Sequence, residues 1–154
     1  MDPQTDGDDM KAVLRRHFEE VLNLGRVDVI DELYSEDYVL DAPFSADGTP
    51  EQHATTSGRD GLRERVGLFR TAFPDIVFSV EELLAEGGSA VARYVFRGTH
   101  LGPFGDLAAT GRTMSVTGIL VAHFRAGTIY EAFSEFDSGD MMRQLVPASA
   151  SAAG

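Results

Sequence analysis

Asp137 and His100 are the residues whose type and position best suit proton-transfer chemistry. Each stands at the end of a stretch whose alternation predicts a β-strand. A carboxyl or an imidazole held beside a carbonyl compound can take a proton from carbon and return one to oxygen. The structural alternatives are an aspartate that caps the turn before Gly139 and a buried histidine at a strand end. Residue type and spacing alone leave both interpretations open.

Several neighbours could complete a site around these two residues. By strict alternation Glu135 shares the face of Asp137, and two coupled carboxyls would raise one pKa. We instead expect a bulge that turns Glu135 to solvent. Aromatic side chains suit the walls of a flat ligand's site, although each also suits simple core packing. The candidates for substrate contact besides Glu135 are Phe133, Asp41, Phe69, Phe73, Phe104 and Tyr94.

Composition excludes several classes of function. The chain has 154 residues, a net charge of −12 and no cysteine. Strong negative charge argues against nucleic acid or an anionic membrane as partner, and the lack of cysteine excludes thiolate catalysis and disulfides. Metal-ligand spacings and phosphate-binding glycine loops are absent from the sequence, so we expect no metal site and no phosphate loop. No apolar run approaches the length that spans a bilayer, so we expect no membrane segment. The acidic N-terminus is unlike a secretory signal, which predicts a cytoplasmic protein.

The periodicity that must position these residues changes near residue 74. Helical spacing predicts helices over 9–24, 27–33 and 58–73, with a short strand over 37–43 and a loop over 46–57. Beyond Pro74 the period becomes two, which predicts strands over 76–85, 89–100, 113–125 and 128–136. This order predicts an α+β fold, a strongly curved, mostly antiparallel sheet against about three helices. We expect one domain over 9–146, with disordered tails at 1–8 and 147–154.

The order and spacing of several segments resemble the SnoaL-like polyketide cyclase family of the NTF2-like cone folds. These segments are 18–30 (FEEVLNLGRVDVI), 33–39 (LYSEDYV), 69–75 (FRTAFPD), 80–86 (VEELLAE), 97–100 (RGTH), 110–112 (TGR), 127–137 (GTIYEAFSEFD) and 144–145 (QL). The resemblance implies one cone-shaped domain that encloses a ligand cavity, needs no metal or organic cofactor and forms a homodimer or higher homo-oligomer.

The resemblance also gives roles to individual residues. It implies that Asp137 is the general acid and base for enolisation and ring closure, and that His100 faces the cavity. Phe133 stands where relatives often have tryptophan. Asp41 is a departure, because Leu40-Asp41 replaces an aspartate–histidine pair of many relatives.

The resulting functional hypothesis is a cofactor-independent enzyme of antibiotic biosynthesis, a lyase or isomerase that cyclises a hydrophobic polyketide or aromatic intermediate. The alternatives are a part in polyketide ring hydroxylation or another tailoring step, and a non-catalytic module that binds a small ligand. Strands near 91–97 and 119–123 carry large residues on both faces, so we also expect a homodimer packed sheet to sheet.

Overall fold

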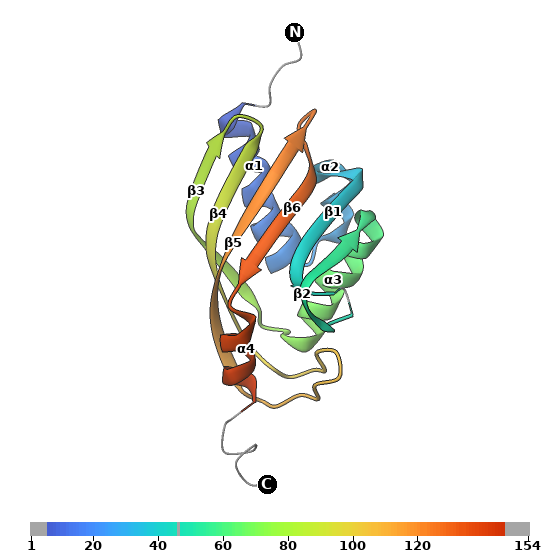
Figure 1. The fold of residues 1–154 in the computed structure, drawn as a ribbon, viewed down its shortest axis with the longest axis vertical. Coiled ribbons are helices and arrows are strands. Elements are labelled where there is room, and N and C mark those ends of the chain that lie inside the picture. Colours follow the sequence, from blue (N-terminus) through green and yellow to red (C-terminus); the bar gives the residue numbers. More distant parts are fainter. Residues whose placement is uncertain (1–5, 46, 147–154) are drawn as a thin grey trace.

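A single curved sheet of six strands forms one wall of the molecule, in the order β2-β1-β6-β5-β4-β3 (Figure 1). The computed structural model of the protein describes residues 6–45 and 47–146. The strands are β1 (Tyr34–Phe44), β2 (Pro50–Ser57), β3 (Val77–Glu86), β4 (Ser89–Thr99), β5 (Thr113–Arg125) and β6 (Thr128–Phe136). Neighbouring strands are antiparallel except for β1 and β6, which are parallel. The α+β prediction, with a curved and mostly antiparallel sheet, is therefore confirmed.

The longer helices cover one face of this sheet. Helix α1 (Gly7–Arg16) continues into the π-helical segment η1 (His17–Asn23), and the short elements η2 (Val27–Val29) and α2 (Ile30–Leu33) follow. Helix α3 (Gly58–Ala72) lies beside β1 and β2, and α4 (Ser138–Leu145) packs near one end of β5. No helix within the described residues is long and apolar enough to cross a bilayer.

Three local features differ from the sequence-based expectation. The first helix begins at Gly7 and is π-helical in its second part, where we expected a regular helix over 9–24. Residues 50–57 form strand β2 rather than a loop, because pairing with β1 organises a polar edge strand in which Ala54 and Thr56 are buried. Helix α4 was not expected. Disordered tails were predicted over 1–8 and 147–154, but Gly7 and Asp8 belong to α1. Residues 1–5 and 147–154 lie outside the described residues.

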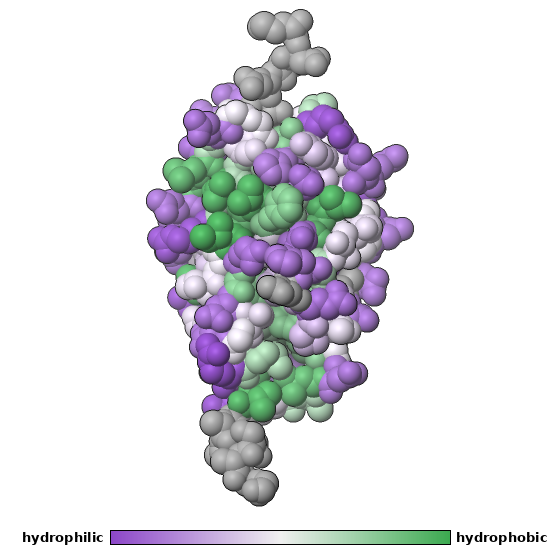
Figure 2. Space-filling model, in the orientation of Figure 1, coloured by the Kyte–Doolittle hydropathy of each residue, from purple (hydrophilic) through white to green (hydrophobic). Residues whose placement is uncertain are grey.

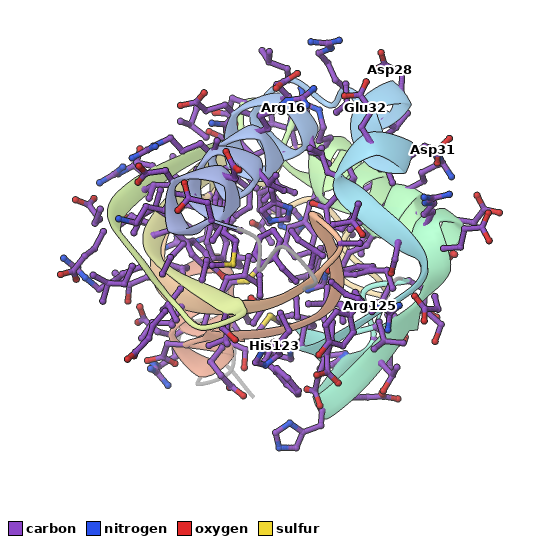
Figure 3. All side chains as sticks on the ribbon, turned by 90° about the horizontal axis from the view of Figure 1, so that it is seen from above. Arg16, Asp28, Asp31, Glu32, His123 and Arg125 are labelled. Atoms are coloured by element: carbon purple, nitrogen blue, oxygen red, sulfur yellow. The ribbon has the colours of Figure 1, made fainter. Side chains whose placement is uncertain are left out.

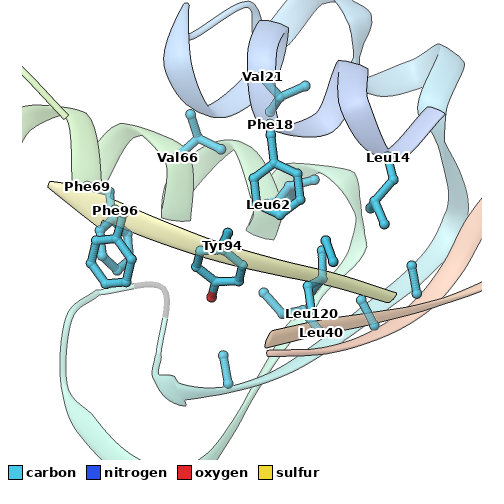
Figure 4. Packing of buried hydrophobic residues seen from close by; sticks show 14 of the residues in the cluster. Leu14, Phe18, Val21, Leu40, Leu62, Val66, Phe69, Tyr94, Phe96 and Leu120 are labelled. Carbon is cyan, nitrogen blue, oxygen red and sulfur yellow. The ribbon is translucent and has the colours of Figure 1, made fainter. Parts of the chain in front are cut away.

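The core fills the space between the helices and the concave face of the sheet. Figure 4 shows Phe18 of η1, Phe69 of α3 and Tyr94 of β4 among the buried residues that fill this space. The other labelled members of this cluster are Leu14, Val21, Leu40, Leu62, Val66, Phe96 and Leu120. The exposed ion pair between Arg16 and Glu32 lies on the helical side, whereas His123 and Arg125 lie on the other side of the sheet (Figure 3).

A bulge in β6 decides which of its residues face the core. His123 pairs with Glu131, but the next residue, Phe124, pairs with Ile129, so Tyr130 has no partner opposite it. Side chains at odd positions point inward before the bulge and those at even positions point inward after it. Ile129, Ala132 and Ser134 are accordingly buried, while Phe133 and Glu135 are exposed.

Candidate functional site

A cavity of about 60 Å³ lies inside the curve of the sheet, between η1, α3 and strands of both halves of the chain. Aromatic and aliphatic side chains make most of its wall, and the polar side chains among the lining are His17, Tyr38, Arg65, Tyr94 and Ser134. A second hollow of about 30 Å³ adjoins it and shares Arg65 and Phe69 with it. An apolar enclosure with a few convergent polar groups is the usual form of a small-molecule site.

The phenols of Tyr94 and Tyr38 provide two of these polar groups. Tyr94 on β4 reaches across β5 to Ser134 on β6, with 2.9 Å between the two hydroxyl oxygens. It can do so because its strand neighbour is Gly118, which leaves the space above β5 free for the ring. Burial raises the pKa of Tyr94 to about 12, and it also raises the pKa of Tyr38. Both phenols therefore stay protonated and can donate hydrogen bonds to a ligand oxygen.

His17 enters the cavity from the first turn of the π-helical segment. Its Nδ1 is hydrogen-bonded to the hydroxyl of Tyr34, and its ring packs edge-on against Phe18. Burial lowers the pKa of His17 to about 3, so the imidazole is neutral at physiological pH. Within η1, Phe18 and Leu22 line the cavity as well. π-Helical turns are rare and occur frequently at functional sites, which fits this placement.

Arg65 places a guanidinium group in the same enclosure. The side chain is 7% exposed, donates from Nη1 to the carbonyl of Phe44, and stacks 5.2 Å from the ring centre of Phe69. Burial lowers the pKa of Arg65, and nearby phenols partly offset this effect. An arginine nevertheless remains protonated, since its ordinary pKa lies far above neutral pH.

The structure brings two of the predicted substrate-contact residues, Phe69 and Tyr94, into the cavity wall. Two others, Phe73 and Phe104, are buried behind Phe69, with ring centres 6.4 Å and 5.2 Å from it. Neither of them lines the cavity. They support Phe69 as part of the core rather than the mouth of the site.

His100 lies one layer further from the cavity. It is fully buried, its ring packs 5.3 Å from that of Phe73, and Nδ1 accepts a hydrogen bond from the backbone N–H of Thr110. The proton of the neutral ring is then on Nε2, which is buried without a hydrogen bond to the described residues. Burial lowers the pKa of His100, and the carbonyl of Gly102 only partly offsets this. This geometry fits a structural role, because Phe73 separates the ring from the cavity.

The bulge at Tyr130 moves the remaining candidates away from the cavity. Phe133 and Glu135 are exposed on the outer face of the sheet, so the expectation that Glu135 turns to solvent agrees with the structure. Asp41 is next to Phe133 on that face, where its Oδ1 lies 3.2 Å from Nδ1 of His53. Asp137 is 62% exposed and accepts a hydrogen bond from the N–H of Asp140, which makes it the N-cap of α4.

Apart from Tyr94, the polar residues of the cavity were not among the candidates predicted from the sequence. His17 has the helical spacing of Leu14, Phe18 and Val21, and Arg65 has that of Leu62 and Phe69. A charged or titratable residue at a position where the helical spacing predicts an apolar one would have pointed to both residues. Within the described residues, no three His, Asp or Glu side chains cluster in a way that could bind a metal ion.

A surface groove leads toward the cavity between η1 and the edge strand β3. Phe18 and Phe78 contribute to both, and their ring centres are 6.1 Å apart. The amide of Asn23 bridges the two elements at this point, because it donates to the carbonyl of Phe78 and accepts from its N–H. Phe18 and Phe78 are therefore the two residues that the groove and the cavity have in common.

The sequence matches the family described as SnoaL-like polyketide cyclase over residues 12–145. Among solved structures, a candidate SnoaL-like polyketide cyclase from Jannaschia sp. CCS1 is 18% identical, with a TM-score of 0.79 and coverage of 96% of both chains. IdmH of Streptomyces antibioticus, a candidate polyketide cyclase, is 25% identical, with a TM-score of 0.72 over 88% of this chain and 97% of that one.

A third similar structure is AclR of Streptomyces galilaeus, a candidate hydroxylase. It is 21% identical, with a TM-score of 0.73 over 91% of this chain and 97% of that one. No protein with curated annotation matches the chain. The structural likeness to AclR and to the Jannaschia protein concerns the fold, and the fold alone does not determine a reaction.

Proposed function

Because the chain belongs to the SnoaL-like polyketide cyclase family, we propose that it is a small enzyme that closes a ring in a poly-carbonyl or aromatic intermediate. The reaction is an intramolecular aldol-type cyclisation that runs by general acid–base catalysis and needs no cofactor. The observation that carries this proposal is the convergence of His17, Tyr38 and Tyr94 in an otherwise apolar cavity. We place the reaction in antibiotic biosynthesis in the cytoplasm.

The cavity residues can divide the chemistry between them. Nδ1 of His17 is hydrogen-bonded to the hydroxyl of Tyr34, which leaves Nε2 to take a proton from a substrate carbon next to a carbonyl. The electron pair of that C–H bond forms an enolate, whose carbon attacks a carbonyl further along the same substrate chain. The attacked carbonyl becomes an alkoxide, and the imidazolium of His17 returns the proton to it. Tyr94 and Tyr38 donate hydrogen bonds to the oxygens on which negative charge develops.

The low pKa of His17 does not prevent this proton transfer. It results from burial of a charged ring without a counter-charge. When the imidazolium forms next to an enolate, the two charges attract each other in a site that excludes water, and the cost of burial falls. The neutral ring is also the protonation state in which a base must be to begin the reaction.

Size and shape determine how a ligand fits. A cavity of about 60 Å³ holds only a few waters, so a flat intermediate must also use the adjoining hollow and displace Phe18 or Phe78. Aromatic walls then hold the chain folded, so that the reacting carbons stay close, and this proximity supplies much of the rate.

The decisive experiment compares His17→Gln with Asp137→Asn in the cyclisation of a synthetic aryl 1,3,5-triketone, measured as its disappearance above the buffer rate. Removal of a positioned acid–base group costs about 10²–10⁴-fold in turnover. We expect this loss for His17→Gln, and parent rates for Asp137→Asn and for the control His53→Gln, which changes an exposed histidine. If instead Asp137→Asn loses turnover and His17→Gln keeps it, Asp137 is the acid–base group that the family resemblance implies.

A second candidate function is non-catalytic binding of the same class of ligand. The observation that favours it concerns Asp137, the expected acid–base residue. Asp137 lies outside the cavity and is the N-cap residue of α4. The two functions differ in one result. A binder would take up the triketone without any acceleration of its cyclisation by the parent protein.

A further inference from the structure

Arg65 is a buried cation for which the protein supplies no buried anion. It lies on the inner side of α3 and lines both the main cavity and the adjoining hollow. Within residues 6–45 and 47–146, no carboxylate lies within 4.0 Å of its guanidinium group, although seven other arginines there form ion pairs with carboxylates. A charge taken out of water without a partner is costly, so buried charges are normally paired.

The contacts that Arg65 does make are incomplete. Of the five N–H groups of a guanidinium, one is used in the described chain, by Nη1 to the carbonyl of Phe44. The ring of Phe69 covers one face of the group. The nearby phenols of Tyr38 and Tyr94 are donors at neutral pH rather than counter-charges. Several donors of a fixed, planar cation are thus available to a ligand that occupies the cavity.

We propose that the substrate carries a permanent carboxylate and that Arg65 binds it inside the cavity. This inference rests on the proposed function, since it names the class of substrate for the same site. The guanidinium fork matches the two oxygens of a carboxylate, and the aromatic wall beside it suits a planar, conjugated carbon skeleton attached to that group. The substrate class is therefore an aromatic or conjugated poly-carbonyl compound that also bears a carboxylate.

A phosphate fits these surroundings less well than a carboxylate. Arg65 is the only cationic side chain of the described residues that lines the main cavity, and a phosphate dianion would keep an uncompensated charge. Arg70, which lines the adjoining hollow, already donates from Nη1 to the carbonyls of Leu22 and Asn23. One cation and about 60 Å³ of space therefore favour a small, singly charged group.

Benzoate and benzamide provide a direct test, because they have nearly the same shape and differ in charge. Their dissociation constants are measured by NMR titration of the full chain. We expect the parent protein to bind benzoate about 10- to 100-fold more tightly than benzamide, the range typical of a hydrogen bond to a charged partner. In Arg65→Met this preference disappears while benzamide still binds, and Arg65→Lys keeps part of it.

The matched control is Arg63→Gln, which removes another cation from the same helix. Arg63 pairs with Asp31 and Asp60, and both of these partners are on the surface. Arg63→Gln should keep the full preference for benzoate. Replacement of a buried charge by an apolar residue of similar size is often tolerated, so Arg65→Met is expected to fold. The inference is overturned if the parent binds both ligands equally, if it binds no benzoate, or if Arg65→Met keeps the preference.

This binding test is independent of turnover. Equal binding of the two ligands, combined with accelerated cyclisation of the neutral triketone, would overturn the carboxylate inference and leave the proposed function intact. A clear preference for benzoate, combined with no cyclisation of any poly-carbonyl substrate, would overturn the proposed function and leave Arg65 as the binding group of an acid receptor.

Discussion

His17 is a buried base, and its protonation should link the stability of the protein to pH. The pKa of the ring is about 3 in the folded protein, against 6.5 for an ordinary histidine. Above pH 6.5 the ring is neutral in both states and its contribution to stability is complete. As the pH falls from 6.5 toward 3, the unfolded chain binds a proton that the folded protein does not, so stability decreases.

We therefore expect the free energy of unfolding to fall by about 1.5 kcal/mol between pH 6.5 and 5 through this one group. Urea denaturation at these two pH values measures it. In His17→Gln the decrease should be smaller by that amount, whereas His53→Gln, which changes an exposed ring, should keep it. Equal pH dependence in the parent and in His17→Gln would mean that His17 is not a neutral buried ring.

Gly118 is the residue on which the position of the Tyr94 ring depends. A Cβ atom added at Gly118 would lie 2.6 Å from both Cζ and the hydroxyl oxygen of Tyr94. Gly118→Ala should therefore displace the phenol, break its hydrogen bond to Ser134, and cost about 1–3 kcal/mol of stability, as overpacking usually does. Turnover should fall with it, because Tyr94 lines the cavity.

The control for this change is Gly67→Ala, also a glycine to alanine substitution but in the middle of α3. No atom lies within 4 Å of the position that its Cβ would occupy. Alanine should stabilise the protein there by about 0.5–1 kcal/mol, because it is the better helix former. Thermal unfolding of both variants measures the contrast, and a stable, fully active Gly118→Ala protein would contradict the assigned role of the Tyr94 ring.

At the level of elements, the sequence predicts the structure well where one period governs a whole segment. The ranges expected for the last two strands, 113–125 and 128–136, are those of β5 and β6. The polar strand β2 was missed because its pairing with β1, and not its own pattern, makes it a strand. The apolar residues between 9 and 24 keep a regular helical spacing, so the sequence pattern does not reveal that η1 is π-helical.

The site was harder to predict than the elements, and the bulge at Tyr130 is the main reason. Alternation counted from Ile129 puts Asp137 on the inner face, but one unpaired residue in β6 reverses that parity for every later position. Bulges depend on how two strands fit together, and a single sequence does not reveal their position. Phe69 and Tyr94 line the cavity, and no such irregularity precedes either of them within its own element.

At the scale of the whole molecule, the outer face of the sheet carries an apolar row that favours association. The register places Leu84, Val91, Val121 and Phe133 side by side across four strands. Leu84 is 59% exposed and Phe133 38% exposed. A green area lies over these strands in the upper half of Figure 2. Apolar area of this kind is typical of a contact between proteins.

We expect this row to be the centre of a homodimer packed sheet to sheet. Light scattering should give the mass of a dimer at micromolar concentration, and Phe133→Glu should shift it to a monomer, because a buried unpaired carboxylate is costly. Leu24→Glu is the control, since it adds the same charge at an exposed leucine beside the π-helical segment. A monomeric parent protein at that concentration would contradict the prediction.

The single parallel pair, β1 with β6, has a consequence for how the chain acquires its structure. Leu40 pairs with Ala132, about 90 residues further along the chain, so this contact closes the longest loop in the sheet. Strands β3 to β6 can assemble from hairpins, whereas β1 and β2 must wait until the last strand exists. On the ribosome, the edge of β1 that pairs with β6 therefore remains unpaired until almost the whole chain has emerged. The cavity cannot be completed before then, because Ser134 and Phe136 are part of its wall.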